Sequence, residues 1–507
     1  APTPTIMSDV NVPDRPTRSS GATIARNAAF VTLGRVLLKL FGFLFTVFVV
    51  RQLGDDQYGR YSIVVAWVGL FSIFVELGVT QFAMREIARS AGRAGSLFWN
   101  LVAMRLALAL IGLIVIPIGA TLAGYTGDIT LGVTLYVLTF VIAAFQAPLE
   151  ATLTAREAFG WLTVTAVVGQ VSWIGMGAIA MWLRPDFVWL IGVGVVAMLP
   201  PLAVDVWIVA RLKLVDWGVR LQASEWPRLV RAGLPFAVIS LSLTIAFGID
   251  TVMLSWFVPN AEVGWYNVAY GLVRSMVALL NGFSIAMLPT AARVYATDRG
   301  AVARWHAQII RFIALAAAPV AVGGMLVADP LVRFLYTPDL YPAALPLAII
   351  VWDVPLLMYA ASCGNLTTAI GEEKAAARIN LINAAANVVL NAIFIPRYGM
   401  IGAAVITVAT DAIASLQFTL LLRKRLSLPN MTGVLLRVGL ASAGLAAVVA
   451  VAGHQHVLVL LALGVVVYGV LAWVLGAIGP DERELGRRMW AAGRRRLARG
   501  LEGRQSP

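Results

Sequence analysis

Long apolar runs, separated by short polar connections, occupy almost the whole chain. Each run is about 20 residues or longer, which is enough for a helix rising 1.5 Å per residue to cross a hydrocarbon core of about 30 Å. Strand-like alternation with regular turns is absent, so the pattern predicts an all-α integral membrane protein with 14 transmembrane helices. The runs lie near residues 26–51, 58–83, 97–123, 129–154, 161–183, 187–211, 230–257, 264–289, 303–328, 342–369, 377–395, 400–422, 433–453 and 457–478.

The two halves of the chain resemble each other at an offset of about 205 residues. The matching positions are Gly59-Arg60-Tyr61 with Gly264-Trp265-Tyr266, and Trp99 and Arg105 with Trp305 and Arg311. Six runs separate the copies, an even number, so both halves enter the membrane in the same direction. The repeat predicts two pseudo-symmetric six-helix lobes, residues 26–211 and 230–422, joined by a cytoplasmic linker at 212–229 and followed by two C-terminal helices at 431–478.

Polar segments flank this region on both sides. Residues 1–25 are rich in Pro and polar side chains and lack the apolar core of a signal peptide, so we expect a disordered cytoplasmic tail. Residues 479–507 form a basic tail, also expected in the cytoplasm, in which Leu485, Met489 and Trp490 lie among many arginines. An amphipathic helix on the anionic inner leaflet fits this tail, with a solvated coil as the alternative.

Composition agrees with a membrane protein, because 60% of residues are apolar and 13% are charged, against about 25% charged in soluble proteins. The net charge of +13 would suit nucleic acid, but its distribution indicates topology instead. Alternate connections and both tails hold 28 Lys and Arg residues, the other connections hold 5, and the runs hold 6. The positive-inside rule therefore predicts a multi-pass plasma (inner) membrane protein with both termini cytoplasmic and no nucleic-acid partner.

Several sequence features of enzymes and ATP-driven pumps are missing. The chain has no GxxxxGK[ST] loop, no HExxH motif and no Cys/His cluster, and its one cysteine, Cys363, cannot form an intrachain disulfide. We therefore expect no catalytic residues, no metal site and no cofactor. Na⁺, H⁺ or the membrane potential remain as candidate energy sources.

Five cations lie two or three turns inside the apolar runs, where a charge costs several kcal/mol. They are Arg35, Lys39, Arg105, Arg274 and Arg311. Arg35 and Lys39 are four residues apart and share one helical face. Pairing with buried acids or snorkelling to the interface would explain such residues, whereas a cationic cavity would bind an anionic substrate such as a phosphate. We favour the cavity for Arg35 and Lys39, since the one nearby acid, Glu76, cannot neutralise both.

Other polar residues inside the runs are candidates for transport. Four amides spaced three, four and four residues apart form one helical stripe, as polar cavity lining or as bridges between helices: Asn380, Asn383, Asn387 and Asn391. Asp250, Asp353 and Glu76 are candidates for ion coupling, with a structural pair to an arginine as the alternative, and Asp411 is undecided.

Four segments resemble a known family. The segment from Leu366 to Thr407 contains an Asn-Val-Leu-Asn helix and an Ile-Pro-x-Tyr-Gly-x-x-Gly-Ala-Ala connection. This pattern, together with Gly248 to Leu272 and the segments LGDDQYGRYS and ELGVTQFAMREIAR, resembles the oligosaccharide (polysaccharide biosynthesis) flippases. That family belongs to the multidrug/oligosaccharidyl-lipid/polysaccharide exporter superfamily, and the resemblance covers about residues 25–480.

The resemblance implies two six-helix lobes plus two helices. It also implies flipping of polyprenyl-diphosphate-linked oligosaccharide from the cytoplasmic to the outer leaflet, by alternating access of a central cavity with a lateral opening for the polyprenyl tail. The expected partners are this glycan lipid, membrane lipids and a glycan polymerase or other assembly proteins, and the expected oligomeric state is a monomer.

Three alternative functions remain. A lipid II flippase of peptidoglycan synthesis would share the fourteen spans and the cationic cavity. A multidrug/cation antiporter would be expected to carry an acid in the first helix, where this chain has Arg35 and Lys39. A membrane glycan ligase or glycosyltransferase would need acids or His in an outer loop, but the longest such loop, Asp329 to Tyr341, has two acids and no His. Enzyme activity is therefore not expected.

Overall fold

The computed structural model describes residues 21–89, 94–215, 217–218, 221–280, 299–426, 430–453 and 455–479. Three predicted features lie outside these residues: most of the N-terminal tail, the basic tail with its amphipathic helix, and the end of the run at 264–289.

Helices make up all the regular secondary structure of the described residues, which confirms the all-α prediction. Nine of these helices are long and apolar enough to cross a membrane, or up to ten if one bent pair forms a single span. The α-helices are α1 (Gly21–Glu76), α2 (Val79–Arg89), α3 (Ala94–Leu122), α4 (Asp128–Ala155), α5 (Phe159–Leu183), α6 (Phe187–Ala197), α7 (Leu199–Arg211), α8 (Trp226–Phe257), α9 (Asn260–Leu280), α11 (Arg299–Leu326), α12 (Ala328–Leu335), α13 (Ala344–Ile350), α14 (Asp353–Ala369), α15 (Glu373–Arg425), α16 (Thr432–Val451) and α17 (Val457–Val474). Short 3₁₀ helices lie at η2 (Ala223–Glu225) and η3 (Pro338–Ala343).

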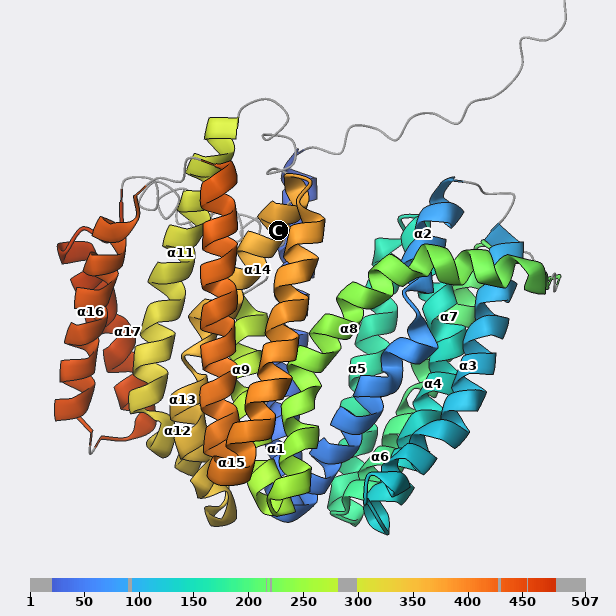
Figure 1. Ribbon diagram of the computed structural model, residues 1–507, viewed down its shortest axis with the longest axis horizontal. Helices are drawn as coiled ribbons and strands as arrows, with labels where there is room; N and C mark the ends of the chain where they lie inside the picture. Colours follow the sequence, from blue (N-terminus) through green and yellow to red (C-terminus); the bar gives the residue numbers. More distant parts are fainter. Residues whose placement is uncertain are drawn as a thin grey trace, which may run out of the picture.

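Helices and apolar runs differ in number because some runs join and others break. The runs at 26–51 and 58–83 share α1, and those at 377–395 and 400–422 share α15. Each of these helices contains a glycine with positive φ, Gly54 (71°) and Gly399 (53°), a conformation that side-chain-bearing residues rarely adopt. The two halves of α15 run side by side in opposite directions (Figure 1). The run at 342–369 is instead bent by 47° between η3–α13 and α14.

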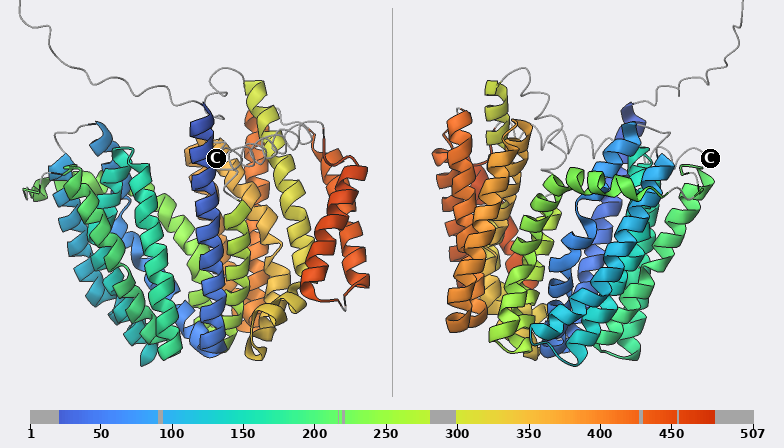
Figure 2. Two further views of the ribbon diagram at one scale, coloured as in Figure 1. Left: turned by 180° about the vertical axis from the view of Figure 1, so that it is seen from behind. Right: turned by 45° about the vertical axis from the view of Figure 1, so that its right-hand side comes forward.

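The helices form two groups (Figures 1 and 2). We call α2 to α7 with the second half of α1 the N-terminal group, and α9 to α15 the C-terminal group. The first half of α1 stands between the groups, and α16 and α17 pack beside α11 at the outer edge of the C-terminal group (Figure 2). Helix α8 begins above the N-terminal group, bends, and descends into the C-terminal group (Figure 1).

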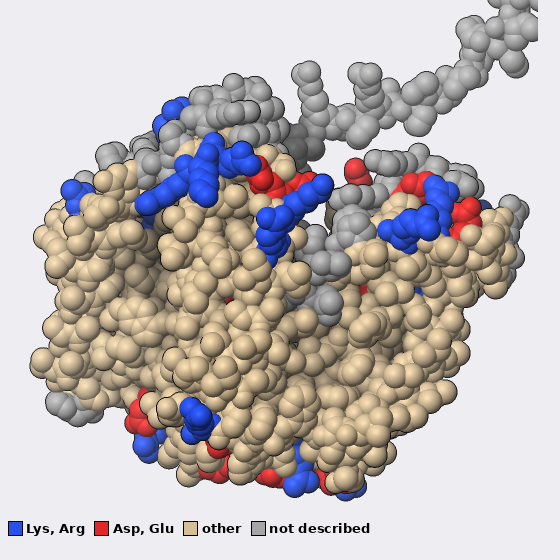
Figure 3. Space-filling view, in the orientation of Figure 1, with Lys and Arg blue, Asp and Glu red and all other residues tan. Residues whose placement is uncertain are grey.

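Charged side chains gather at the two ends of the bundle. Figure 3 shows them at the upper and lower edges of one face, with an uncharged band between. Large apolar side chains on the band are exposed, as on α3, where Ile111, Ile114 and Ile118 are each more than half exposed. We call the end with Arg423, Lys424 and Arg425 the basic end and the end with the Gly54 turn the opposite end. A surface of this kind suits a lipid bilayer.

The two groups are in closest contact at the opposite end. Gly59 of α1 crosses Gly264 of α9 so closely that a Cβ on Gly59 would overlap the carbonyl oxygen of Asn260, and one on Gly264 would overlap that of Asp55. Gly59 and Gly264 are also the two positions matched by the internal repeat. Repeat-related residues therefore meet each other here, and the missing side chains allow the backbones to touch.

Replacing Gly264 with Ala should lower the free energy of unfolding by about 1–3 kcal/mol, because its methyl group must displace backbone rather than a mobile side chain. Thermal unfolding of the detergent-purified protein measures this effect. Gly271→Ala on the same helix is the matched control, since nothing lies within 4 Å of its Cβ position. It should leave stability unchanged or raise it by up to about 1 kcal/mol through helix propensity. Equal effects of both substitutions would contradict the close crossing.

Candidate functional site

A cavity of about 370 Å³ lies where the two groups face each other around the first half of α1. Three helices contribute its polar lining: Lys39 and Thr46 from α1, Gln170 from α5 and Ser275 from α9. Leu38, Leu40, Gly42, Phe43, Trp173 and Ala278 complete it. Because α5 belongs to the N-terminal group and α9 to the C-terminal group, this central cavity is bounded by both. Its volume falls in the range of about 300–1,000 Å³ that is typical of ligand sites.

Lys39 carries the positive charge of the central cavity. It is 15 residues before Gly54, which puts it about 22 Å along the helix from the turn at the opposite end. Its side chain is exposed in the cavity wall. Arg274 precedes Ser275 of the cavity wall, is exposed, and lies with its guanidinium carbon 5.9 Å from the ring centroid of Tyr270. The side chain of Arg35 lies outside the described residues.

The other two predicted cavity cations lie elsewhere. Arg105 is 6% exposed inside the N-terminal group, where its Nη1 donates to Thr80 Oγ1 at 2.8 Å. Glu76 is near enough to act on the Arg105 charge. Arg311 donates from Nη2 to the carbonyl oxygen of Ala477 at 2.9 Å and so ties α11 to the segment after α17. The structure therefore brings Lys39 and the Arg274 region together, and separates Arg105 and Arg311 from them.

The asparagine stripe faces other helices over most of its length. Asn383 Nδ2 donates to Gln417 Oε1 at 3.0 Å, which bridges the two halves of α15. Asn391 Nδ2 donates to Asn387 Oδ1 at 3.0 Å and to Asp250 Oδ1 of α8 at 2.6 Å. Asn383, Asn387 and Asn391 are all buried, while Asn380 is partly exposed. The contacts of Asn383 and Asn391 therefore bridge helices, which was one of the two roles considered for the stripe.

Asp250 is 5% exposed and accepts three hydrogen bonds. Besides Asn391, its donors are Tyr266 and Thr407, whose hydroxyls both donate to Oδ2 at 2.8 Å. The predicted alternative for Asp250 was an ion pair with an arginine. Its partners in these three hydrogen bonds are instead one amide and two hydroxyl groups. Three donors to one carboxylate satisfy most of its hydrogen-bonding capacity without a cation.

Asp353 has different surroundings. It opens α14 directly after the bend and is fully buried, and neither of its carboxylate oxygens has a hydrogen-bond donor among the described residues. Asp411, on the second half of α15, is near enough to act on the charge of Asp353. Two neighbouring carboxylates repel each other when both are ionised, and a proton or a cation held with them would relieve that repulsion.

Contacts between distant segments close the opposite end. The side chain of Arg51 donates to the carbonyl oxygens of Phe334 and Leu335. Asp339 of η3 accepts twice, from the Asp55 backbone N–H to Oδ2 at 3.1 Å and from the Trp265 indole to its carbonyl oxygen at 2.8 Å. The hydroxyl groups of Tyr125 and Ser255 also join the N-terminal group to α8. These hydrogen bonds join the two groups at the opposite end.

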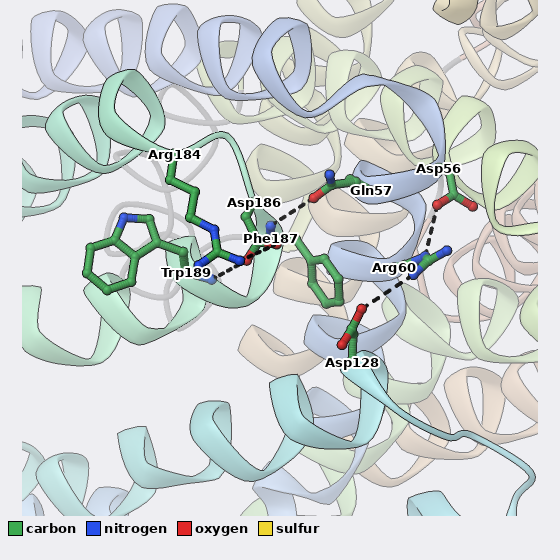
Figure 4. A network of polar contacts seen from close by, with 8 residues as sticks. All are labelled: Asp56, Gln57, Arg60, Asp128, Arg184, Asp186, Phe187 and Trp189. Carbon is green, nitrogen blue, oxygen red and sulfur yellow. Dashed lines mark hydrogen bonds and ion pairs between the residues drawn. The ribbon is translucent and has the colours of Figure 1, made fainter.

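A second network steadies the same end within the N-terminal group (Figure 4). Arg60 pairs with Asp56 at 2.9 Å and with Asp128, which opens α4, at 3.7 Å. Gln57 accepts from the Phe187 backbone N–H at 3.1 Å, and Asp186 caps α6 by accepting from the Trp189 N–H at 2.9 Å. The network joins the turn of α1 to the beginnings of α4 and α6.

Of the central cavity's lining, sequence reasoning predicted Lys39 alone and missed the other polar residues, Thr46, Gln170 and Ser275, as well as Trp173. Gln170 carried a usable signal, because an amide in the middle of an apolar run is costly unless it meets a polar group. Thr46 and Ser275 carried none, since Thr and Ser donate to the carbonyl four residues earlier, as both do here.

Two curated relatives are named as probable flippases, one of them of glycan biosynthesis. The probable low-salt glycan biosynthesis flippase of Haloferax volcanii is 20% identical over 77% of this chain and 81% of its own length. The probable flippase AglR of the same organism is 28% identical over 33% of this chain, and this match spans 36% of the relative.

Solved structures share the fold at low identity. The lipid II flippase MurJ in an inward closed conformation has a TM-score of 0.73 and 14% identity, over 88% of this chain and 99% of that one. An inward-facing multidrug resistance MATE family transporter has a TM-score of 0.64 and 17% identity, over 77% of this chain and 94% of that one. The described helices therefore have the fold of these transporters.

Family membership follows from matches of the sequence to two family models. The MatE model matches residues 235–393. The polysaccharide biosynthesis protein model matches residues 24–295, which is more than half of the chain. The protein therefore belongs to the polysaccharide biosynthesis protein family, within the superfamily that also contains the MATE transporters.

Proposed function

We propose that the protein flips polyprenyl-diphosphate-linked oligosaccharide from the cytoplasmic to the outer leaflet. The observation that carries this proposal is the central cavity, which holds Lys39 between two helix groups that hydrogen bonds join at the opposite end. A diphosphate supplies the anion that such a charge would bind. The name of one curated relative, a probable low-salt glycan biosynthesis flippase, supports a glycan over lipid II as the cargo, whereas the likeness to the lipid II flippase concerns the fold alone.

The proposed topology has fourteen crossings in two pseudo-symmetric six-helix lobes plus two helices. In this arrangement α1 and α15 each cross twice, the pairs α6–α7 and α13–α14 cross once each, and α16 and α17 are the additional helices. The basic end faces the cytoplasm, with both termini on that side, and the membrane is the plasma membrane. The meeting of Gly59 with Gly264 supports an axis between the lobes, because these residues correspond in the repeat.

In this proposal, binding of an ion by Asp353 and Asp411, the acid pair, couples transport to an ion gradient. Asp250 is less suited to the role, because three neutral donors already stabilise its carboxylate. Asp353 lacks donors and follows a break in its span, and interrupted helices form ion sites in many transporters. Na⁺ or H⁺ held between the two carboxyl groups would stabilise one conformation over the other.

Locking the opposite end should stop transport. Asp55→Cys combined with Asp339→Cys puts a thiol on each of two residues that are in contact, since the Asp55 backbone N–H donates to the Asp339 carboxylate at 3.1 Å. An oxidant should join them and lower the flipping of a fluorescent polyprenyl-diphosphate glycan in proteoliposomes by tenfold or more, and a reductant should restore it. The one native cysteine, Cys363, is fully buried and should not interfere.

Each single-cysteine variant, treated with the same oxidant, is the control. Full transport by the oxidised, cross-linked double variant would contradict alternating access at this end. Failure of the unmodified protein to flip the lipid would instead overturn the proposed function.

A further inference from the structure

A second, larger cavity of about 580 Å³ lies inside the N-terminal group. It is bounded by α4, α5 and the junction of α6 and α7. Its polar lining consists of Gln146, Glu150, Thr154, Thr165 and Gln170. Gln170 and Trp173 line this cavity and the central one alike, so the two are adjacent and share a wall on α5. A molecule with its charged group at Lys39 could extend past these two side chains into the second cavity.

Trp173 is held in place at this shared wall. Its ring meets the ring of Phe45 on α1 edge to face, with centroids 5.5 Å apart. On the other side, a Cβ at Gly194 of α6 would come within 3.0 Å of the indole, so the missing side chain makes room for the ring. Gly42 makes similar room for the amide of Gln170, whose Nε2 is 3.1 Å from the position of a Cβ there. Packing therefore orients both side chains before any ligand arrives.

Polar side chains in and behind the wall of the second cavity have hydrogen-bonding capacity that their protein partners do not fill. Glu150 accepts from Gln146 Nε2 at 3.1 Å through one of its oxygens. Behind the wall, the fully buried Asp205 accepts from Thr165 Oγ1 at 2.8 Å, and no residue in the described part of the chain donates to its Oδ2. Polar groups inside a membrane are costly unless they meet water or a polar ligand. Two amides and a carboxyl group around an aromatic ring therefore indicate a site for a polar ligand.

A sugar matches this lining. A pyranose carries hydroxyl groups around its rim and C–H bonds on its faces, so it combines hydrogen bonds to amides and carboxylates with contact to an aromatic ring. We propose that the second cavity is a sugar subsite, which binds the first sugar of the lipid-linked glycan against Trp173 while the diphosphate lies at Lys39. This inference rests on the proposed function and assigns its substrate a second contact region.

Binding measurements on the purified full-length protein in lipid nanodiscs test the subsite. The probes are bare polyprenyl diphosphate and a panel of polyprenyl-diphosphate monosaccharides carrying hexoses or N-acetylhexosamines. At least one sugar-bearing lipid should bind more tightly than the bare lipid. Trp173→Ala should remove about tenfold of the affinity that the sugar adds, the effect of losing one well-packed aromatic contact, measured as the ratio of the variant's affinities for the sugar-bearing and the bare lipid.

Two further variants test whether a loss of binding by Trp173→Ala reflects a folding defect. Glu150→Gln keeps the shape of the side chain and should weaken the sugar-bearing lipid about threefold or more through a lost charged acceptor. Trp182→Ala, on the same helix but 83% exposed, is the matched control and should change neither affinity.

The binding results distinguish failure of the sugar subsite from failure of the proposed flippase function. Binding of the bare lipid without any gain from a sugar, or a gain that survives both Trp173→Ala and Glu150→Gln, would overturn the subsite and leave the flippase proposal standing. Absence of binding by every lipid, the bare diphosphate included, would overturn the proposed function and the subsite together.

Discussion

Replacing Lys39 with Gln is expected to reduce flipping of a polyprenyl-diphosphate glycan by tenfold or more, and combining it with Arg35→Gln is expected to abolish flipping. Lys39 supplies the charge in the wall of the central cavity, and Gln keeps most of its length while removing the attraction for a diphosphate. Glycan export in cells and flipping in proteoliposomes both measure the effect, with protein abundance in the membrane determined in parallel.

Lys374→Gln is the matched control for this experiment. Lys374 lies exposed in the first turn of α15 and is not part of the central cavity. It should retain normal export, because a solvent-facing charge at a helix end contributes little to a distant site. Normal export by the Lys39 variant at normal abundance would contradict the phosphate-binding role of the cavity.

Replacing Asp353 with Asn is expected to remove the response of transport to an imposed ion gradient. The substitution leaves Asp411 without a second carboxyl group, so the repulsion that a proton or a cation would relieve is absent. Flipping in proteoliposomes without a gradient should stay within about twofold of the original protein, whereas acceleration by a Na⁺ or H⁺ gradient should disappear. Measurements with each ion separately would also identify which one is coupled.

Asp329→Asn tests whether the effect is specific to the acid pair. Asp329 is an exposed acid on α12 that pairs with Arg333 at 2.8 Å, so its loss should leave the gradient response intact. Equal loss of transport by Asp353→Asn with and without a gradient would show that Asp353 supports the fold instead. An unchanged response to both gradients would remove Asp353 from the coupling mechanism.

The internal repeat was visible in the sequence, but only the structure showed that two of its matched residues are in contact. Gly59 and Gly264 matched as one pair among several in a highly apolar chain. Their direct contact across α1 and α9 gives the match a physical reason, since only residues without side chains allow the backbones to approach so closely. The long helices α1 and α15 were less predictable, because a helix that reverses at one glycine looks like two separate runs.

Charged and polar residues inside the runs were located correctly but not assigned to partners. Lys39 and Arg311 look alike in sequence, each a cation buried in an apolar run. The fold puts one in a cavity wall and the other on the carbonyl oxygen of Ala477. Likewise, the asparagine stripe was clear, yet its hydrogen bonds to Gln417 and Asp250 join residues far apart in the chain.

The sequence by itself determined that this is a helical membrane protein, because the length and apolarity of each run depend only on neighbouring residues and on the thickness of the bilayer. The flippase family was indicated by the resemblance of particular segments, not by these runs. Tertiary structure alone decided which cation faces a cavity, which carboxyl groups are neighbours, and that Trp173 lies between two cavities. The physical reason is that the helical period of a sequence predicts on which face of its helix a side chain lies. It does not predict which other helix packs against that face, and the chemistry of a site depends on that second helix.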